Sequence, residues 1–302
     1  MSSSITFVRR LHQLIRHWKF RHDLDIAIKF DLIDFISYAQ EFRTQTGLKP
    51  LLVTDEGVFV QTNLGFFVWF NPRYKHGILW GVEKNGVWEV GVTKHCIERM
   101  KKGGTFLDIG ANVGMFSMSI AISLENIAVH AFEPVPDNYL TLEKNVKINK
   151  LSSKVILNNL AVGCECKTIS MMVDGQLSHV STGNNKSDFK SVGINCVSID
   201  HYCETNRIND VTLIKCDVEG FELEVLKGAE KTIRLHKPTL ILEIEDRWTH
   251  RYGYSGKDIF VFMESMNYVS QSILPNGELG HMDSSIEQKL NQSNVFLLEP
   301  KV

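Results

Sequence analysis

Short apolar runs alternate with amphipathic stretches along the second two-thirds of the chain. Helical patterns separate the runs, which lie at residues 105–109, 128–132, 155–160, 211–216 and 239–244. Repeated strand and helix order predicts a parallel sheet with helices on both faces. Two final runs, residues 267–273 and 294–298, are joined by a turn and a short connection, which favours an antiparallel pair at the end of the sheet. The pattern therefore predicts an α/β fold from about residue 91 onward.

A further pair of β-patterned runs interrupts this order. Residues 168–173 and 192–197 predict a hairpin, and its connection, residues 174–191, is polar and contains glycine. Long polar loops beside the carboxyl edge of a sheet often act as lids. We therefore expect residues 174–191 to lie next to a ligand site.

The first 90 residues lack this regular alternation and predict a separate α+β cap. Two helical patterns come first, and β-runs at 57–60 and 65–70 then flank a turn at Asn63 and Gly65. Residues 1–22 carry five Arg or Lys and no Asp or Glu, with apolar residues at helical spacing. Such a basic amphipathic helix packs on its own protein, docks on a partner, lies on a membrane surface or serves as an organelle transit sequence. Aromatic residues at 66–88 form either a small core or the rim of a pocket.

Composition narrows the function classes. The 302 residues are 43% apolar and 23% charged with a formal charge of −2, which is typical of a globular protein and disfavours a nucleic-acid partner. The N-terminus lacks the continuous apolar core of a secretory signal, and no run approaches the ~20 apolar residues of a membrane span. The six cysteines show no metal or disulfide spacing. These features predict a cytoplasmic protein and leave its oligomeric state open.

A glycine turn follows the first apolar run. It reads Asp108-x-Gly110-x-Asn112-x-Gly114, with a carboxylate where the dinucleotide fingerprint has its first glycine. A carboxylate there repels a pyrophosphate and suits a cationic ligand such as a sulfonium or an amine. Gly110 permits the sharp turn, and Gly114 lets the next helix pack closely. The alternative is an ordinary glycine turn without a ligand.

Polar residues also end the second and third runs. Glu133 lies 19 residues after Gly114, the separation at which an acidic side chain binds ribose hydroxyls. Its alternative role is to cap the helix that starts near Pro136 and Asp137. Asn159 and Leu160 end the third run, where an amide and a backbone N–H suit an adenine edge, although such asparagines are commonly turn formers.

Carboxylates gather after the fourth and fifth runs. Asp217 and Glu219 follow the fourth run, and Glu243 and Glu245 share one side of the otherwise apolar fifth. An unpaired buried carboxylate is costly, so each needs a partner, a metal ion or water. We therefore expect an acidic rim at the centre of the carboxyl edge.

Four segments carry a family resemblance. The chain from about Trp88 to Leu298 resembles the FkbM family of S-adenosylmethionine-dependent methyltransferases through the runs FLDIGANVGMFS, AFEPVPDNYLTLEKNV, LIKCDVEGFELEVLKGAEKTI and PTLILEIE. The resemblance implies a class I, Rossmann-like fold with seven mostly parallel strands in the order 3-2-1-4-5-7-6. It divides the chain into an extension, residues 1–90, and a methyltransferase domain, residues 91–302.

The resemblance also implies roles for the polar residues. Residues 108–114 would line the methionine end of the cofactor, Glu133 and Pro134 its ribose, and Asn159 and Leu160 its adenine. The implied reaction is O-methylation of a hydroxyl on a sugar or glycan, a lipid or a secondary metabolite, by in-line displacement. N-methylation is disfavoured because Asp217-Val218-Glu219-Gly220 replaces the N/D-P-P-Y/F motif.

A hydroxyl nucleophile needs a base, and the candidates are Asp217, Glu219, Glu243 and His179. We expect Asp217 to hold the ammonium group of the cofactor and Glu219 or Glu243 to lie near the substrate. Oxygen ligands of this kind can bind Mg²⁺, but no residue pattern designates a metal site.

Two other functions compete with this interpretation. One is a non-catalytic cofactor-binding or scaffold module that residues 1–22 recruit to a partner or membrane. The other is an NAD-dependent oxidoreductase, which Asp108 disfavours.

Overall fold

The computed structural model describes residues 51–54, 57–69, 88–173, 179–181 and 190–301. The chain separates into two compact units, residues 1–87 and residues 88–302. The basic stretch at residues 1–22 and the aromatic residues between 70 and 87 lie outside the described residues, so their predicted roles stay predictions.

The described part of the first unit is a three-stranded antiparallel sheet. Its strands are β1 (Leu51–Thr54), β2 (Gly57–Gln61) and β3 (Phe67–Trp69), paired in chain order. Gly65, at φ +93°, donates its N–H to the carbonyl of Thr62 at 3.0 Å, which closes the turn between β2 and β3. The predicted hairpin around Asn63 and Gly65 is confirmed.

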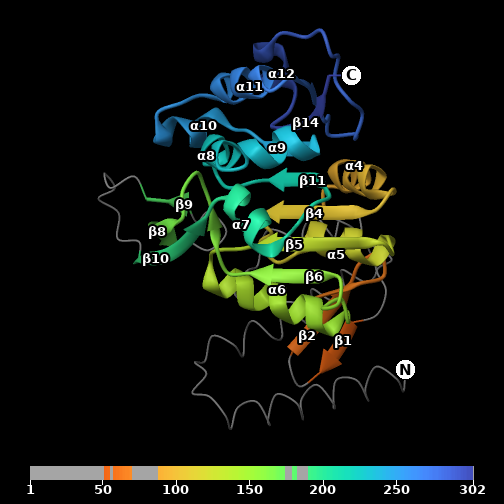
Figure 1. Cartoon of the computed structure of the whole chain (residues 1–302). Helices are drawn as coiled ribbons and strands as arrows, with labels where there is room; N and C mark the ends of the chain where they lie inside the picture. The colour runs from red at the N-terminus through yellow and green to blue at the C-terminus, as the bar shows by residue number, and fades with distance from the viewer. Residues whose placement is uncertain (1–50, 55–56, 70–87, 174–178, 182–189, 302) are drawn as a thin grey trace. The chain divides into compact units, whose positions relative to one another are not determined.

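The second unit is built on a seven-stranded sheet in the order β13-β14-β12-β11-β4-β5-β6 (Figure 1). When the seven strands are counted by their order along the chain, this arrangement reads 3-2-1-4-5-7-6 from the β6 edge, as predicted. Only β14 runs antiparallel to its neighbours. The strands are β4 (Gly104–Ile109), β5 (Ile127–Phe132), β6 (Val155–Asn158), β11 (Val211–Cys216), β12 (Thr239–Glu243), β13 (Tyr268–Ser272) and β14 (Val295–Pro300).

Helices cover both faces of this sheet. On one face, α4 (Val90–Met100) packs on α5 (Met115–Ser123), and α6 (Pro136–Ile148) begins with Pro136 at its first turn, as predicted. The other helices are α7 (Ile199–Asn206), α8 (Glu222–Lys227), α9 (Glu230–His236), α10 (Asp246–Thr249), the 3₁₀ helix η2 (His250–Tyr252), α11 (Gly256–Ser265) and α12 (Ile286–Gln292). Among the described residues, none of these helices has the length and apolar character needed to cross a bilayer.

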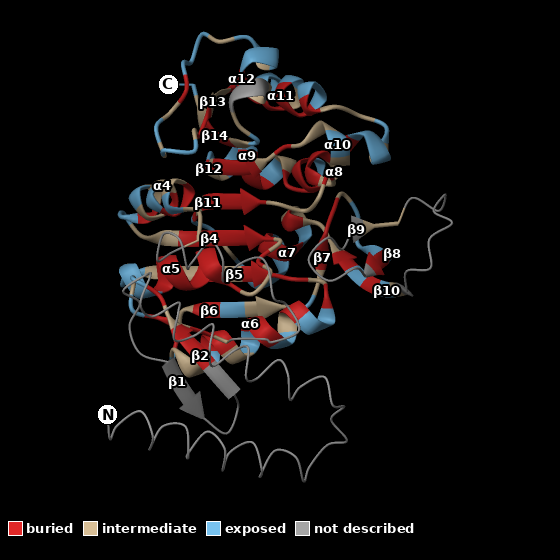
Figure 2. Ribbon diagram, turned by 180° about the vertical axis from the view of Figure 1, so that it is seen from behind, coloured by how far each residue is buried: buried red, intermediate tan, exposed pale blue. Residues whose placement is uncertain are grey.

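The two faces of the sheet differ in chemistry. Alternate residues of β4, β11 and β12, such as Leu107, Ile214 and Leu242, join α7, α9 and α11 in one continuous apolar core (Figure 2). The opposite face of β4 and β11 carries Asp108 and Lys215, which are opposite each other in the parallel register. Because side chains alternate along a strand, this face brings buried charges beside α4 and α5.

A second, smaller sheet has the order β7-β10-β8-β9 and lies beyond the carboxyl ends of the parallel strands (Figure 1). Its strands are β7 (Ala161–Val162), β8 (Lys167–Val173), β9 (His179–Val180) and β10 (Lys190–Val197). The antiparallel pairing of β8 with β10 confirms the predicted hairpin. Within the loop predicted as a lid, residues 174–191, the structure describes residues 179–181, where β9 pairs with Met171 and Met172, and residues 190 and 191, which begin β10.

Val180 explains why β9 forms within the predicted loop, since it packs on the small apolar core under the second sheet. The β9 strand is only two residues long, too short to show an alternating pattern.

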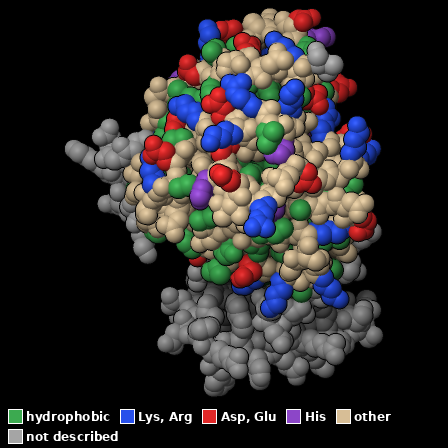
Figure 3. Space-filling model, viewed as in Figure 1, with side chains coloured by type: hydrophobic (Ala, Val, Ile, Leu, Met, Phe, Trp, Pro, Cys, Tyr) green, Lys and Arg blue, Asp and Glu red, His purple; other side chains and the backbone are tan. Residues whose placement is uncertain are grey.

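Over the visible face of the molecule, acidic and basic side chains are interspersed (Figure 3). This distribution differs from the basic stripe of a nucleic-acid-binding face.

Candidate active site

A pocket lies at the carboxyl ends of β4, β5 and β11, against the second sheet. It encloses about 700 Å³ when the space open to solvent is included. Three carboxylates line it and, among the described residues, no lysine or arginine does. The lining residues are Ile109, Gly110, Asn112, Phe132, Glu133, Pro134, Val135, Asn138, Leu160, Ala161, Val162, Met171, Val180, Asp217, Val218, Glu219 and Phe221.

The turn between β4 and α5 forms one wall. Gly110, Asn112 and Gly114 all have positive φ, and the N–H groups of Gly110 and Ala111 both donate to the carbonyl of Phe132. A Cβ at Gly110 would lie 1.8 Å from the carbonyl oxygen of Asp217, and one at Gly114 would lie 2.4 Å from Leu142. Glycine is therefore required at both positions, by close packing as well as by the backbone angle.

Asp108 lies behind this turn and is fully buried. One carboxylate oxygen accepts hydrogen bonds from the Ser117 N–H at 3.1 Å and from the Ser117 hydroxyl at 2.6 Å. Burial raises the pKa of Asp108, while Lys215 and Ser117 oppose the shift. Asp108 is absent from the pocket lining, so in this geometry it ties the start of α5 to β4. Direct contact with a cofactor stays a prediction.

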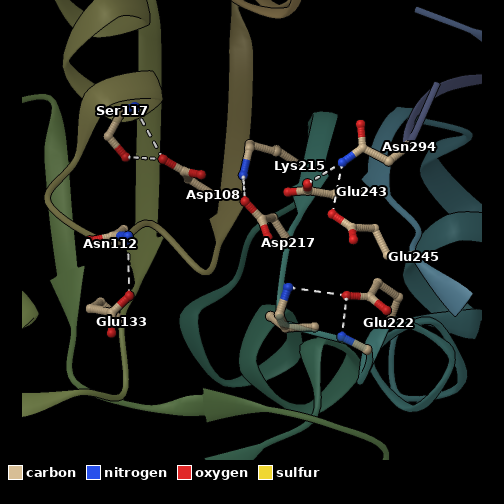
Figure 4. Close-up of polar contacts among 12 residues, drawn as sticks. Asp108, Asn112, Ser117, Glu133, Lys215, Asp217, Glu222, Glu243, Glu245 and Asn294 are labelled. Atoms are coloured by element: carbon tan, nitrogen blue, oxygen red, sulfur yellow. Dashed lines mark hydrogen bonds and ion pairs between the residues drawn. The ribbon is translucent and has the colours of Figure 1, made fainter. Parts of the chain in front are cut away.

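Glu133 borders the pocket and is held by backbone donors. Its carboxylate accepts the N–H groups of Asn112 at 2.8 Å and Val135 at 2.9 Å. Burial raises its pKa to about 7, although these hydrogen bonds oppose the shift. The side-chain oxygen of Asn112 is buried and has no hydrogen-bond partner among the described residues. Asn112 thus donates its backbone N–H to Glu133 (Figure 4), and both residues line the pocket.

The two residues predicted at the end of the third strand, Asn159 and Leu160, have different positions. Leu160 and Pro134 line the pocket. The exposed Asn159 instead donates its side-chain amide to the carbonyls of Glu133 at 2.8 Å and Pro134 at 3.2 Å. Asn159 therefore holds the backbone that follows Glu133, and its predicted contact with adenine stays a prediction.

The turn between β11 and α8 forms the opposite wall. Glu219 and Gly220 adopt positive φ, and a Cβ on Gly220 would lie 2.5 Å from the backbone of Trp248. Glu222 accepts the N–H groups of Val218 at 3.2 Å and Gly220 at 3.0 Å, so its buried carboxylate closes the turn (Figure 4). With that carboxylate committed to the backbone, Asp217 and Glu219 remain in the pocket lining.

Lys215 is the cation of this region. It is 4% exposed, lies 4.7 Å from the Phe116 ring centroid, and donates to Asp217 at 3.1 Å. Burial alone would lower its pKa, but Asp217, Asp108 and Glu89 raise it, so Lys215 is charged. One ammonium group thus stabilises several carboxylates that face it from three different elements.

Glu243 and Glu245 are joined by one amide. The side chain of Asn294 donates to Glu243 at 2.6 Å and to Glu245 at 3.0 Å (Figure 4). Burial and the neighbouring Asp217 raise the pKa of Glu243 to about 10. The predicted role of Glu243 as a general base stays a prediction.

Glu219 has the properties of a base. Burial, Asp217 and Glu245 raise its pKa to about 7, while Arg247 and Arg251 oppose the shift. A carboxylate whose pKa lies near the working pH is substantially ionised and still has a high affinity for the proton that it must accept. Glu219 also lines the pocket, whereas Glu243 does not.

The remaining predicted groups are less defined. His179 begins β9, opposite Met172, but its side chain lies outside the described residues. Among the described residues, no group of three or more His, Cys, Asp or Glu side chains has the arrangement of a metal site.

Several site residues escaped the sequence-based interpretation: Lys215, Glu222, Glu89 and Asn294. Lys215 alone carried a signal, because a lysine within an apolar run needs a partner. The partners of the other three depend on contacts that the local pattern does not encode.

Comparison with known proteins places this geometry in a family. Residues 108–270, more than half of the chain, match the methyltransferase FkbM domain. The methyltransferase sdnD of Sordaria araneosa is 26% identical over 186 residues, which span 50% of this chain and 70% of that protein. The 31-O-demethyl-FK506 methyltransferase FkbM of Streptomyces tacrolimicus is 26% identical over 183 residues, 51% of this chain and 69% of that protein.

A third relative is the hexuronic acid methyltransferase AglP of Haloferax volcanii. It is 28% identical over 147 residues, which span 48% of this chain and 58% of that protein. In all three cases the matched region covers about half of the present chain. Together with the domain match and the strand order, these relatives establish that the chain belongs to the FkbM family of methyltransferases.

Proposed function

We propose that this protein is an S-adenosylmethionine-dependent O-methyltransferase whose acceptor is a hydroxyl of a sugar or another small molecule. The observation that carries the proposal is the pocket between the β4–α5 and β11–α8 turns, lined by Glu133, Asp217 and Glu219 and, among the described residues, by no cationic side chain. The competing oxidoreductase function is set aside because the family transfers methyl groups.

The pocket fits a cofactor that carries a sulfonium, an ammonium and ribose hydroxyls. Glu133 would accept from the hydroxyls, and the unpartnered buried oxygen of Asn112 offers a further acceptor beside it. Asp217 would hold the ammonium, because its own partner Lys215 keeps it in place. When bound, S-adenosylmethionine supplies an electrophilic methyl group on sulfur.

Glu219 would take the proton of the acceptor hydroxyl as that oxygen forms its new bond to the methyl carbon. Glu219 lies in the β11–α8 turn and has a positive φ. The carboxylate of Glu222 stabilises this turn by accepting the N–H groups of Val218 and Gly220. A positioned base of this kind contributes about 10²- to 10⁴-fold to the rate. Phe221, Met171 and Val180 would exclude water from the same space.

Two of the relatives support a hydroxylated small-molecule acceptor. One is named for methylating 31-O-demethyl-FK506 and the other for methylating a hexuronic acid. The four-residue segment from Asp217 to Gly220 adds support, because it replaces the motif typical of N-methylating enzymes.

Calorimetry tests cofactor choice directly. The full chain is titrated with S-adenosylhomocysteine and, separately, with NAD. We expect saturable binding of S-adenosylhomocysteine only. Binding of NAD alone, or of neither compound, would contradict the proposal.

A second experiment tests the reaction. The protein is incubated with methyl-labelled S-adenosylmethionine and fractionated pools of hydroxylated small molecules and glycans, and alkaline stability of the labelled product distinguishes ethers from esters. Label in an alkali-stable ether supports O-methylation of a hydroxyl. Cofactor binding without any transfer would favour the non-catalytic module instead.

A further inference from the structure

The segment that follows β12 places two arginines beside the pocket. It comprises α10 and η2 and carries Arg247, Trp248 and Arg251. The guanidinium carbon of Arg247 lies 4.7 Å from the Trp248 ring centroid, and that of Arg251 lies 4.1 Å from it. One indole ring therefore holds two cationic groups in a fixed place.

Three contacts fix this segment to the pocket wall. The backbone of Trp248 packs directly on Gly220, the neighbour of Glu219. Tyr252 packs edge-on against Phe221, with ring centroids 5.1 Å apart, and donates its hydroxyl to the carbonyl of Val180 at 2.9 Å. Since Phe221 and Val180 line the pocket, these contacts hold the segment that carries Arg251 against the pocket wall, and Arg251 is close enough to lower the pKa of Glu219.

The two arginines differ in what neutralises them. Arg247 forms an ion pair with Glu245, which Asn294 holds in turn. Arg251 is exposed and forms no ion pair with another described residue. A guanidinium that stacks on an aromatic ring keeps its N–H edge available to donate to two oxygens of a carboxylate, sulfate or phosphate. Arg251 is thus oriented by Trp248 but is not neutralised by it.

The charge of the pocket makes this arrangement informative. Its wall carries Glu133, Asp217 and Glu219, so an acceptor with a negative charge would be repelled unless a cation faced it. The positive charges of Arg247 and Arg251 act on Glu219, since both lower its pKa and so oppose the effect of burial. An anionic group at Arg251 would leave the rest of the acceptor directed toward Glu219.

We propose that Arg251, held on Trp248, is an acceptor-binding residue that selects substrates carrying a carboxylate, sulfate or phosphate near the methylated hydroxyl. The inference rests on the proposed methyltransferase function and specifies its acceptor class. Arg247 helps to hold the platform but adds little affinity, because Glu245 already neutralises it.

The test compares matched sugars. Methyl β-D-glucopyranoside is titrated against its 6-carboxylate, 6-sulfate and 6-phosphate counterparts, with and without saturating S-adenosylhomocysteine, using the full chain. We expect at least one charged sugar to bind about tenfold more tightly than the neutral one, as for hydrogen bonds to charged groups. The preferred anion identifies which oxyanion the site takes.

Variants locate the effect. Arg251→Gln should abolish the preference for the charged sugar, and Arg251→Lys should retain part of it because the charge remains without the planar fork. Arg247→Gln should change it less than twofold. Arg234→Gln, which removes an exposed arginine paired with Glu230 on α9, is the matched control and should leave it unchanged.

Equal binding of neutral and charged sugars, or a preference that survives in Arg251→Gln, would overturn the inference. Titrations without S-adenosylhomocysteine keep this outcome separate from failure of the proposed function. Loss of S-adenosylhomocysteine binding contradicts the function, whereas loss of the charge preference alone contradicts only the role of Arg251.

Discussion

The two turns that border the pocket are built alike but present different chemistry. The β4–α5 turn and the β11–α8 turn each follow a central parallel strand, contain residues with positive φ, and are tied by a buried carboxylate. In the first turn, the buried carboxylate of Asp108 accepts the N–H of Ser117. In the second turn, the buried carboxylate of Glu222 accepts the N–H of Gly220. The first exposes backbone and an amide to the pocket, whereas the second exposes Asp217 and Glu219.

This difference shows that the role of a carboxylate in a motif depends on which hydrogen-bond donors surround it. Glu222 and Glu219 are three residues apart, and burial raises the pKa of both to about 7. One oxygen of Glu222 accepts two backbone N–H groups and this side chain is absent from the pocket lining, whereas Glu219 lines the pocket, which favours Glu219 as the carboxylate that accepts a substrate proton. We therefore expect substitution of Glu219 to disturb proton transfer separately from cofactor binding, which Glu133 and Asp217 would share between the two walls of the pocket.

The substitution Glu219→Gln should separate proton transfer from cofactor binding most clearly. We expect kcat to fall about 10²- to 10⁴-fold because the base is removed, while affinity for S-adenosylhomocysteine changes less than about twofold. In the unchanged protein kcat/KM should rise with pH up to about 7 and then level off, since Glu219 must be ionised. Steady-state kinetics across pH checks both.

Glu230→Gln on the exposed face of α9 is the control and should behave like the unchanged protein. A Glu219→Gln variant that retained both its rate and its inflection near pH 7 would assign the base to another residue.

Lys215→Met should disturb both turns at once. The change leaves Asp108 and Asp217 without their buried cation, and breaking a buried pair in this way costs about 3–5 kcal/mol. Urea denaturation followed by circular dichroism measures the loss. Adding Asp108→Asn should restore part of the stability, because one uncompensated charge disappears, and a Lys215→Met variant as stable as the parent would exclude the proposed charge network.

Gly110→Ala tests the point where the two turns meet. The substitution imposes a left-handed strain of about 1–2 kcal/mol and places Cβ against the Asp217 carbonyl, which adds about 1–3 kcal/mol of overpacking. Gly253→Ala is the matched control, since Gly253 has φ +82° but nothing within 4 Å of its Cβ position. Equal unfolding free energies for the two variants would show that contact between the turns is unimportant.

Glu133→Gln should have the smallest effect and should act on the first turn alone. An amide still accepts one hydrogen bond but loses the charge, so we expect about tenfold weaker binding of S-adenosylhomocysteine with kcat nearly unchanged. Calorimetry measures the affinity. The exposed Glu143→Gln on α6 is the control, and equal affinities of the two variants would remove Glu133 from the cofactor site.

Much of the fold was predictable because the signals are local. The five parallel strands were visible as apolar runs, and strand order followed from the family resemblance. The approach of Asp217 to the glycine turn was also predictable, since the carboxyl ends of neighbouring parallel strands meet at one edge. β9 was not, because two residues cannot display an alternating pattern.

The division of labour among the carboxylates was less accessible. Asp108 was expected at the cofactor, but its position behind the turn depends on Ser117 and on the register that sets Lys215 opposite it. Glu243 was predicted as a candidate base, but burial and the neighbouring Asp217, which raise its pKa, could not be foreseen from the local pattern. Both outcomes depend on partners that are distant in sequence, and no periodic pattern encodes those contacts.

The second sheet has a further consequence for how the protein can change. Its first strand, β7, lies parallel to its last, β10, with Ala161 opposite Cys196. The chain therefore leaves the main sheet and returns to it at neighbouring positions. Residues between those positions can be exchanged, lengthened or shortened without altering the register of β4 and β11. The pocket wall that Met171 and Val180 form can then change while the two turns stay the same.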